Sequence, residues 1–213
     1  METCEGTVAG KLGVVLDYSV LDHLHRIDTG TYNGLHESAL ERLRSAAIEG
    51  RIAVWIAEIS YVEMIHGIEK LADNKEATGQ ARQKDAQKQV IADRMHAGRL
   101  GYPCSKFDDT YSRWDVSFRF AGPDSDRASA LEARLESVQG ISVGDARQLV
   151  CCAYPFNGDD VKHHPHLDWF LSEDRALVGA VVSEIQRGRL HELAGIRFGT
   201  SEDIATACPA ILR

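Results

Sequence analysis

The chain of 213 residues carries a formal net charge of −8, and 44% of its residues are hydrophobic. This length suits one sizeable core, so we treat residues 1–213 as a single domain. No apolar run is long enough to span a bilayer, and residues 1–6 lack the basic and apolar parts of a signal peptide. The acidic charge argues against non-specific binding to nucleic acid through a basic surface.

The five cysteines predict neither a zinc ribbon nor a disulfide framework, because their number is odd and no CxxC spacing occurs. Reduced thiols are typical of the cytoplasm, which is the location we predict. Cys151 and Cys152 fall within an apolar stretch and are expected in the core.

The first part of the chain alternates short apolar runs with amphipathic segments, which predicts strands followed by helices. Residues 12–16 are apolar and partly β-branched and form the first predicted strand. In chain order, the pattern then predicts a helix with Val20, Leu21, Leu24 and Ile27 facing inward, a break at 30–34, a helix over 36–49, a strand at 52–56 and a helix from near Ser60.

The middle of the chain, about 74–140, is interpreted as a helical insertion within the domain. Residues 74–97 are polar with mixed charge and predict a solvated helix rather than a basic stripe for RNA. Residues 98–123 contain Gly-Tyr-Pro and Gly-Pro turns and predict irregular structure. A further helix is predicted over 124–138.

The last part of the chain returns to the alternation of helices and strands. The pattern predicts a mostly buried helix from Asp145 to Tyr154, a polar loop to His166, a strand at 167–172, a helix through Val178 and Ile185, a strand at 197–199 and a helix from near Ser201. This alternation predicts an α/β fold with a central parallel sheet flanked by helices on both faces.

Four acidic residues lie at the edges of apolar segments: Asp17, Glu63, Asp145 and Asp174. Asp17 and Asp174 follow predicted strands, and ligand sites of parallel α/β sheets form beyond the carboxyl ends of strands. Glu63 and Asp145 lie near predicted helix starts, where the helix dipole favours a carboxylate. Gathered carboxylates repel one another unless a cation neutralises them, and hard oxygen ligands suit Mg²⁺ or Mn²⁺. The set therefore predicts a metal site for phosphodiester chemistry.

Each acid also has a purely structural interpretation. Asp17 could cap the helix that follows it, and Ser60-x-x-Glu63 matches a capping box. Asp145 could be an N-cap, and Asp174 could belong to a solvated turn. The combination of all four in this order favours the metal site.

The motifs around these acids resemble those of PIN-domain ribonucleases, and most of all the toxin nucleases of type II toxin–antitoxin pairs. The matching segments are Val14-Val-Leu-Asp17-Tyr-Ser19, Ile59-Ser-Tyr-Val-Glu63-Met-Ile-His-Gly67, Gly144-Asp145-Ala and Phe170-Leu-Ser172-Glu-Asp174. The chain differs from the family in having Tyr18-Ser19 where Thr-Asn is common, and in a longer stretch between the second and third acids.

The resemblance implies a PIN-like domain and a metal-dependent endoribonuclease that hydrolyses RNA phosphodiester bonds with Mg²⁺ or Mn²⁺. It implies that Asp17, Glu63, Asp145 and Asp174 are the catalytic and metal-binding residues, with Glu63 acting directly or through water. Ser19 and Ser172 are implied to lie behind these ligands and to orient them, or a metal-bound water, by hydrogen bonds. The implied partners are an RNA substrate, an antitoxin protein and a second copy of the chain in a homodimer. No association with a membrane is expected.

A catalytically silent PIN-like module that binds a protein partner is the alternative function. The intact set of four acids favours the enzyme, because a silent module has no need of mutually repelling carboxylates. A phosphatase would place a second Asp two residues after the first, and Ser19 occupies that position. His163-His-Pro-His166 is interpreted as a polar loop, because proline interrupts any regular ligand spacing.

Overall fold

The computed structural model describes residues 11–28, 30–57, 60, 116–121, 126–156 and 167–212. Four features predicted from the sequence lie outside these residues: the helix that follows Ser60, Glu63 within it, the mixed-charge helix at 74–97, and the histidine loop at 163–166.

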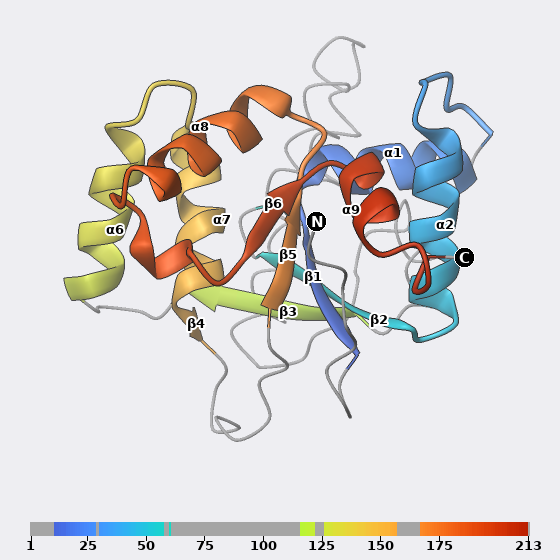
Figure 1. Ribbon diagram of the computed structural model, residues 1–213, viewed down its shortest axis with the longest axis horizontal. Helices are drawn as coiled ribbons and strands as arrows, with labels where there is room; N and C mark the ends of the chain where they lie inside the picture. Colours follow the sequence, from blue (N-terminus) through green and yellow to red (C-terminus); the bar gives the residue numbers. More distant parts are fainter. Residues whose placement is uncertain are drawn as a thin grey trace, which may run out of the picture.

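Within the described residues, a six-stranded sheet forms the centre of the fold, in the order β4-β3-β2-β1-β5-β6 (Figure 1). All neighbouring strands pair in parallel except β4, which runs antiparallel to β3 at one edge. The strands are β1 (Leu12–Leu16), β2 (Ile52–Ala57), β3 (Val116–Ala121), β4 (Pro155–Phe156), β5 (Leu167–Leu171) and β6 (Arg197–Gly199). The predicted α/β class with a central parallel sheet is thereby confirmed.

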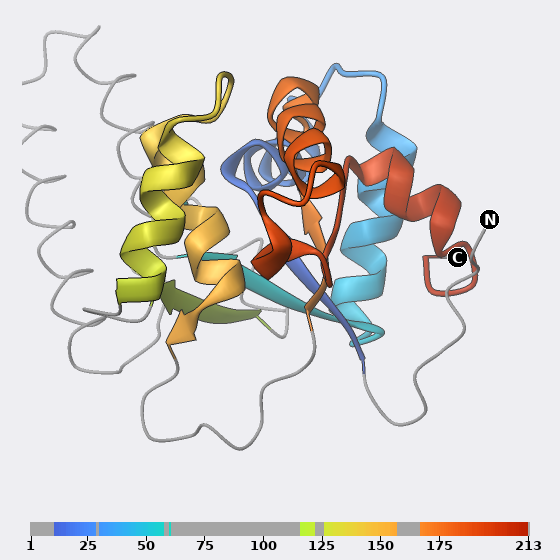
Figure 2. The same cartoon turned by 60° about the vertical axis from the view of Figure 1, so that its left-hand side comes forward.

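Helices cover both faces of this sheet (Figure 2). One group packs on one face: α1 (Tyr18–Asp28), α2 (Glu37–Ile48) and α9 (Ser201–Ala207). The other group packs on the opposite face: α6 (Asp126–Glu136), α7 (Val143–Ala153), α8 (Arg175–Gln186) and the short 3₁₀ turn η1 (His191–Leu193). The fold is therefore a three-layer α/β/α arrangement in the described part of the chain.

The central strand β1 shows why both faces are covered. Val14 and Leu16 belong to the core cluster under α1, α2 and α9. Val15, between them, belongs to the cluster under α6, α7 and α8. Successive side chains of a strand point to opposite faces, so an unbroken apolar run such as Leu12–Leu16 has to be buried on both sides.

Two strands correct the sequence interpretation. Residues 98–123 were expected to be irregular, yet β3 pairs with β2 within this range. The segment Val-Ser-Phe-Arg-Phe-Ala alternates apolar and polar residues, which is the pattern of a strand. The turn residues on either side of it led to the prediction of irregular structure. The expected polar loop after Tyr154 likewise begins with β4, which pairs with the end of β3.

The cysteines agree only in part with the expectation. Cys151 and Cys152 are free and buried in α7, as predicted. Cys208, buried just after α9, is disulfide-bonded, which the odd number of cysteines did not predict. Among the helices that the structure describes, none is both long and apolar enough to cross a bilayer.

Candidate active site

The site predicted from the sequence begins at the point where the strand order reverses. The chain passes from β1 to β2 on one side, whereas β5 pairs with β1 on the other side. Helix α1 follows β1 and helix α8 follows β5, and both helices leave the sheet at the same end (Figure 1). Loops diverge at such a switch point and leave a crevice beyond the carboxyl ends of the strands. Asp17 follows β1 directly at this end.

Asp17 is a buried carboxylate, with 6% of its surface exposed. Its Oδ1 accepts hydrogen bonds from the backbone N–H of Tyr18 at 2.6 Å and from Nε2 of Gln148 at 3.0 Å. Its Oδ2 accepts hydrogen bonds from the hydroxyls of Ser19 and Ser172, both at 2.7 Å. These four donors occupy about all of the acceptor positions of an ionised carboxylate, so a metal ion at Asp17 would have to displace one of them.

The two serine hydroxyls are oriented by backbone groups of the loop after β5. Ser19 Oγ accepts the N–H of Glu173 at 3.0 Å, and Ser172 Oγ accepts the N–H of Asp174 at 3.1 Å. Each hydroxyl has one proton, which is then directed to Asp17. The two hydroxyl oxygens lie 3.3 Å apart. The ends of β1 and β5 are therefore joined through a small hydrogen-bonded ring around the carboxylate.

Gln148 is a member of this site that the sequence interpretation missed. It lies on α7, is fully buried, and contacts Asp17 across a sequence separation of 131 residues. The available signal was an uncharged polar residue directly before the apolar run Leu149-Val-Cys-Cys, three residues after Asp145. Residues three apart on a helix share a face, so α7 turns the face that begins at Asp145 towards β1.

Asp145 completes the start of α7, although it is not the N-cap that one sequence interpretation suggested. The N-cap is Ser142, whose hydroxyl accepts the N–H of Asp145 at 3.2 Å. Asp145 Oδ2 in return accepts the N–H and the hydroxyl of Ser142, at 2.9 and 2.7 Å. This is a capping box. Only one carboxylate oxygen takes part in it, so Oδ1 is left for another ligand.

Asp174 has a comparable arrangement at the start of α8. It is the N-cap, and its Oδ1 accepts the N–H groups of Ala176 and Leu177 at 2.9 and 3.1 Å. Its carboxylate is exposed and lies two residues after Ser172. The cap again uses a single oxygen and leaves Oδ2 available.

The structure joins Asp17 to α7 and to the 172–174 loop, but it does not bring the three described acids into one tight group. Within the residues that the structure describes, no set of three or more His, Cys, Asp or Glu side chains is close enough to hold a metal ion together. Glu63 lies outside those residues. β2, which precedes it, ends at Ala57 beside the end of β1, and Ser60 is buried.

The chemistry of the donors fits a hard divalent cation. Among the residues that the structure describes, the donors to Asp17 are neutral, and no cationic side chain of this part of the chain offsets its charge. Asp145 and Asp174 each keep one oxygen outside their caps. Carboxylate oxygens of this kind are the ligands that Mg²⁺ and Mn²⁺ prefer.

His23 lies on α1 one turn after Ser19, at the edge of the site. Burial lowers the pKa of His23 from its ordinary value of 6.5, although nearby Glu173 and Asp22 oppose this shift. Its ring packs edge-on against Tyr32, with ring centres 5.2 Å apart. Burial therefore favours the neutral form of His23.

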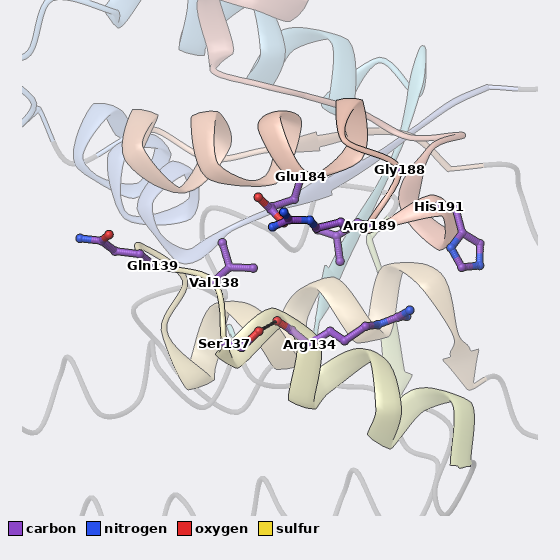
Figure 3. Close-up of a pocket in the computed structure, with 9 residues that line it drawn as sticks. Arg134, Ser137, Val138, Gln139, Glu184, Gly188, Arg189 and His191 are labelled. Atoms are coloured by element: carbon purple, nitrogen blue, oxygen red, sulfur yellow. Dashed lines mark hydrogen bonds and ion pairs between the residues drawn. The ribbon is translucent and has the colours of Figure 1, made fainter.

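A separate cavity of about 570 Å³ lies between the end of α6 and the end of α8 (Figure 3). Its buried acid, Glu184, bonds Arg187 and Arg189. Burial raises the pKa of Glu184, but these two arginines together outweigh burial and hold the pKa below its usual range. Arg134, on the opposite wall, is paired with Glu192. The cavity contains none of the predicted site residues, and its charges are largely matched.

Comparison with protein-family models, curated proteins and solved structures finds no match to this chain.

Proposed function

We propose that the protein is a metal-dependent endoribonuclease that hydrolyses RNA phosphodiester bonds, similar to the PIN-domain nucleases. The observation that supports this most is Asp17, a buried carboxylate at the switch point of a parallel sheet, held by neutral donors from α1, α7 and the end of β5. A carboxylate with a purely structural role at such depth is usually paired with a cation.

In this proposal Asp17, Asp145 and Asp174 would hold Mg²⁺ or Mn²⁺, together with Glu63. The bound ion would supply a water of lowered pKa and polarise the phosphoryl oxygen. The chain's own contribution is orientation: the hydrogen-bonded ring fixes Asp17, and the helix caps fix Asp145 and Asp174 by one oxygen each. Burial of Asp17 keeps bulk water away from one side of the site.

The test is cleavage of single-stranded RNA by purified protein with Mg²⁺ or Mn²⁺, followed by chelation with EDTA. We expect cleavage that EDTA abolishes and that Asp17→Asn lowers by at least about a hundredfold, because a metal supplies several kcal/mol of charge stabilisation. Asp168→Asn is the matched control. Asp168 accepts the N–H of Gly13 at 2.8 Å at the opposite end of the sheet, so this variant should keep its activity.

Folding of Asp17→Asn has to be measured alongside its activity. Loss of one of several repelling carboxylates would by itself stabilise the metal-free protein. The four hydrogen bonds to Asp17 indicate the opposite, because an amide cannot accept all of them, and a loss of about 1–3 kcal/mol is expected. A folded wild-type protein that cleaves no RNA with either metal would leave the silent interaction module as the better proposal.

The toxin and antitoxin part of the resemblance is a further proposal about the same protein. It predicts that expression of wild-type protein without a partner arrests growth, and that Asp17→Asn protein is harmless. Harmless expression of active wild-type enzyme would remove the toxin role and leave the nuclease in place.

A further inference from the structure

Gln148 reaches Asp17 from a helix that is distant in sequence and packs on the opposite face of the sheet from α1. Tyr18 and Ser19 are chain neighbours of Asp17, and Ser172 follows the adjacent strand β5. Gln148 instead comes from α7, the helix that also carries Asp145. Its hydrogen bond therefore spans two of the segments that the proposed metal site needs.

We propose that Gln148 is a positioning residue of the metal site, which fixes Oδ1 of Asp17 and holds α7, with Asp145, in register with β1. This inference rests on the proposed function, because it concerns the metal affinity of the same site. Gln148 has no role among the residues that the family resemblance implied.

The geometry limits what Gln148 can do to orientation. Its Nε2 lies 3.0 Å from Asp17 Oδ1, and the side chain is fully buried, so it contacts no solvent or substrate. With Oδ1 held by Gln148 and Tyr18, the carboxylate cannot rotate freely about its last bond. A buried amide donor is costly to remove, since the oxygen it served is left one hydrogen bond short.

The register of α7 depends on the same contact. Asp145 precedes Gln148 by three residues, so both lie on one helix face. A shift of α7 along its axis would move both residues together by 1.5 Å for each residue of displacement. The Gln148 hydrogen bond opposes that shift at the buried end of the face, while the capping box orders the exposed end.

Three variants separate orientation from packing. Gln148→Met keeps the length of the side chain and removes the donor, and Gln148→Leu removes it with a branched side chain. Gln148→Glu keeps the shape and places a second carboxylate against Asp17, which adds repulsion that a cation relieves. Gln186→Met and Gln186→Glu, at the exposed end of α8, are the matched controls.

The experiment is titration of the whole chain with Mn²⁺ alone. Calorimetry measures the Mn²⁺ affinity, and thermal unfolding measures how far bound Mn²⁺ shifts the unfolding temperature. Gln148→Met and Gln148→Leu should bind Mn²⁺ about tenfold more weakly than wild type, as is usual when a group that orients a ligand is lost. Gln148→Glu should unfold at a lower temperature without metal and show a larger Mn²⁺-induced shift. The Gln186 variants should match wild type.

Two other results would overturn the proposal in distinguishable ways. Wild-type Mn²⁺ affinity in the Gln148 variants, with binding still abolished by Asp17→Asn, would show that Gln148 serves packing alone and would leave the nuclease proposal standing. Absence of Mn²⁺ binding by wild-type protein would overturn both proposals. Because Gln148→Met and Gln148→Leu fill the site differently, failure of one to fold leaves the other to decide.

Discussion

At the scale of single residues, the site is built around one carboxylate that three layers of the chain hold together. The sequence indicated Asp17 because a charged residue that ends an apolar strand run is unusual. It marked Gln148 only as a polar residue beside an apolar run, because a hydrogen bond across 131 residues depends on how α7 packs against the sheet. The orientation of Ser19 and Ser172 is equally non-local, since backbone N–H groups of residues 173 and 174 set it.

His23 gives a prediction about pH at the same scale. Its pKa is lowered in the folded protein by burial, so the unfolded chain binds a proton first as the pH falls. Stability is then fully present well above pH 6.5 and declines as the pH drops below the unfolded value. Urea unfolding at several pH values between about 8 and 5 should show this decline.

His23→Gln should flatten that decline, because the variant has no proton to gain at this position. His191→Gln is the control: His191 is exposed, with 72% of its side chain accessible, and its contact with Glu192 is long at 3.5 Å, so this variant should change the profile less than His23→Gln. An identical pH profile for His23→Gln and wild type would show that other groups cause the dependence.

At the scale of helices and strands, local sequence was most informative where the pattern was long and bounded. Helix α2 was predicted at 36–49 and is found at Glu37–Ile48, because Leu40 and Leu43 repeat at helical spacing before Gly50. The strand β3 escaped prediction because its place in the sheet comes from pairing with β2, and turn residues surround it in sequence.

Two capping boxes of the same design allow the role of Asp145 to be tested. Ser142 with Asp145 begins α7, and Thr200 with Asp203 begins α9. Replacing the acid by Asn should cost each helix about 1 kcal/mol, as for other caps. If Asp145 also binds metal, Asp145→Asn should lose RNA cleavage by a large factor, whereas Asp203→Asn should keep it.

The comparison is completed by Ser142→Ala, which breaks the cap and keeps the Asp145 carboxylate. It should match Asp145→Asn in thermal stability and exceed it in cleavage rate. Equal loss of cleavage in these two variants would show that Asp145 acts only by capping α7.

At the scale of the whole molecule, charge raises a difficulty for an enzyme that acts on RNA. The formal charge is −8, and many arginines of the described residues are paired with acids. These are Arg26, Arg51, Arg134, Arg147, Arg175, Arg187 and Arg189. Bound divalent metal would offset part of the charge at the site, but it would not create a basic groove for the phosphate backbone.

We therefore predict that the protein forms a homodimer in which the second subunit extends the RNA-binding surface. Light scattering after size exclusion should give twice the chain mass of 23.5 kDa. Cleavage rate per chain should fall on dilution below the concentration at which the dimer dissociates, because separated subunits capture RNA more weakly. The Asp168→Asn variant, whose site is unchanged, should show the same dilution profile. The prediction is wrong if light scattering gives the mass of a single chain at high concentration and the cleavage rate per chain does not change on dilution. That result would show that one chain captures RNA unaided.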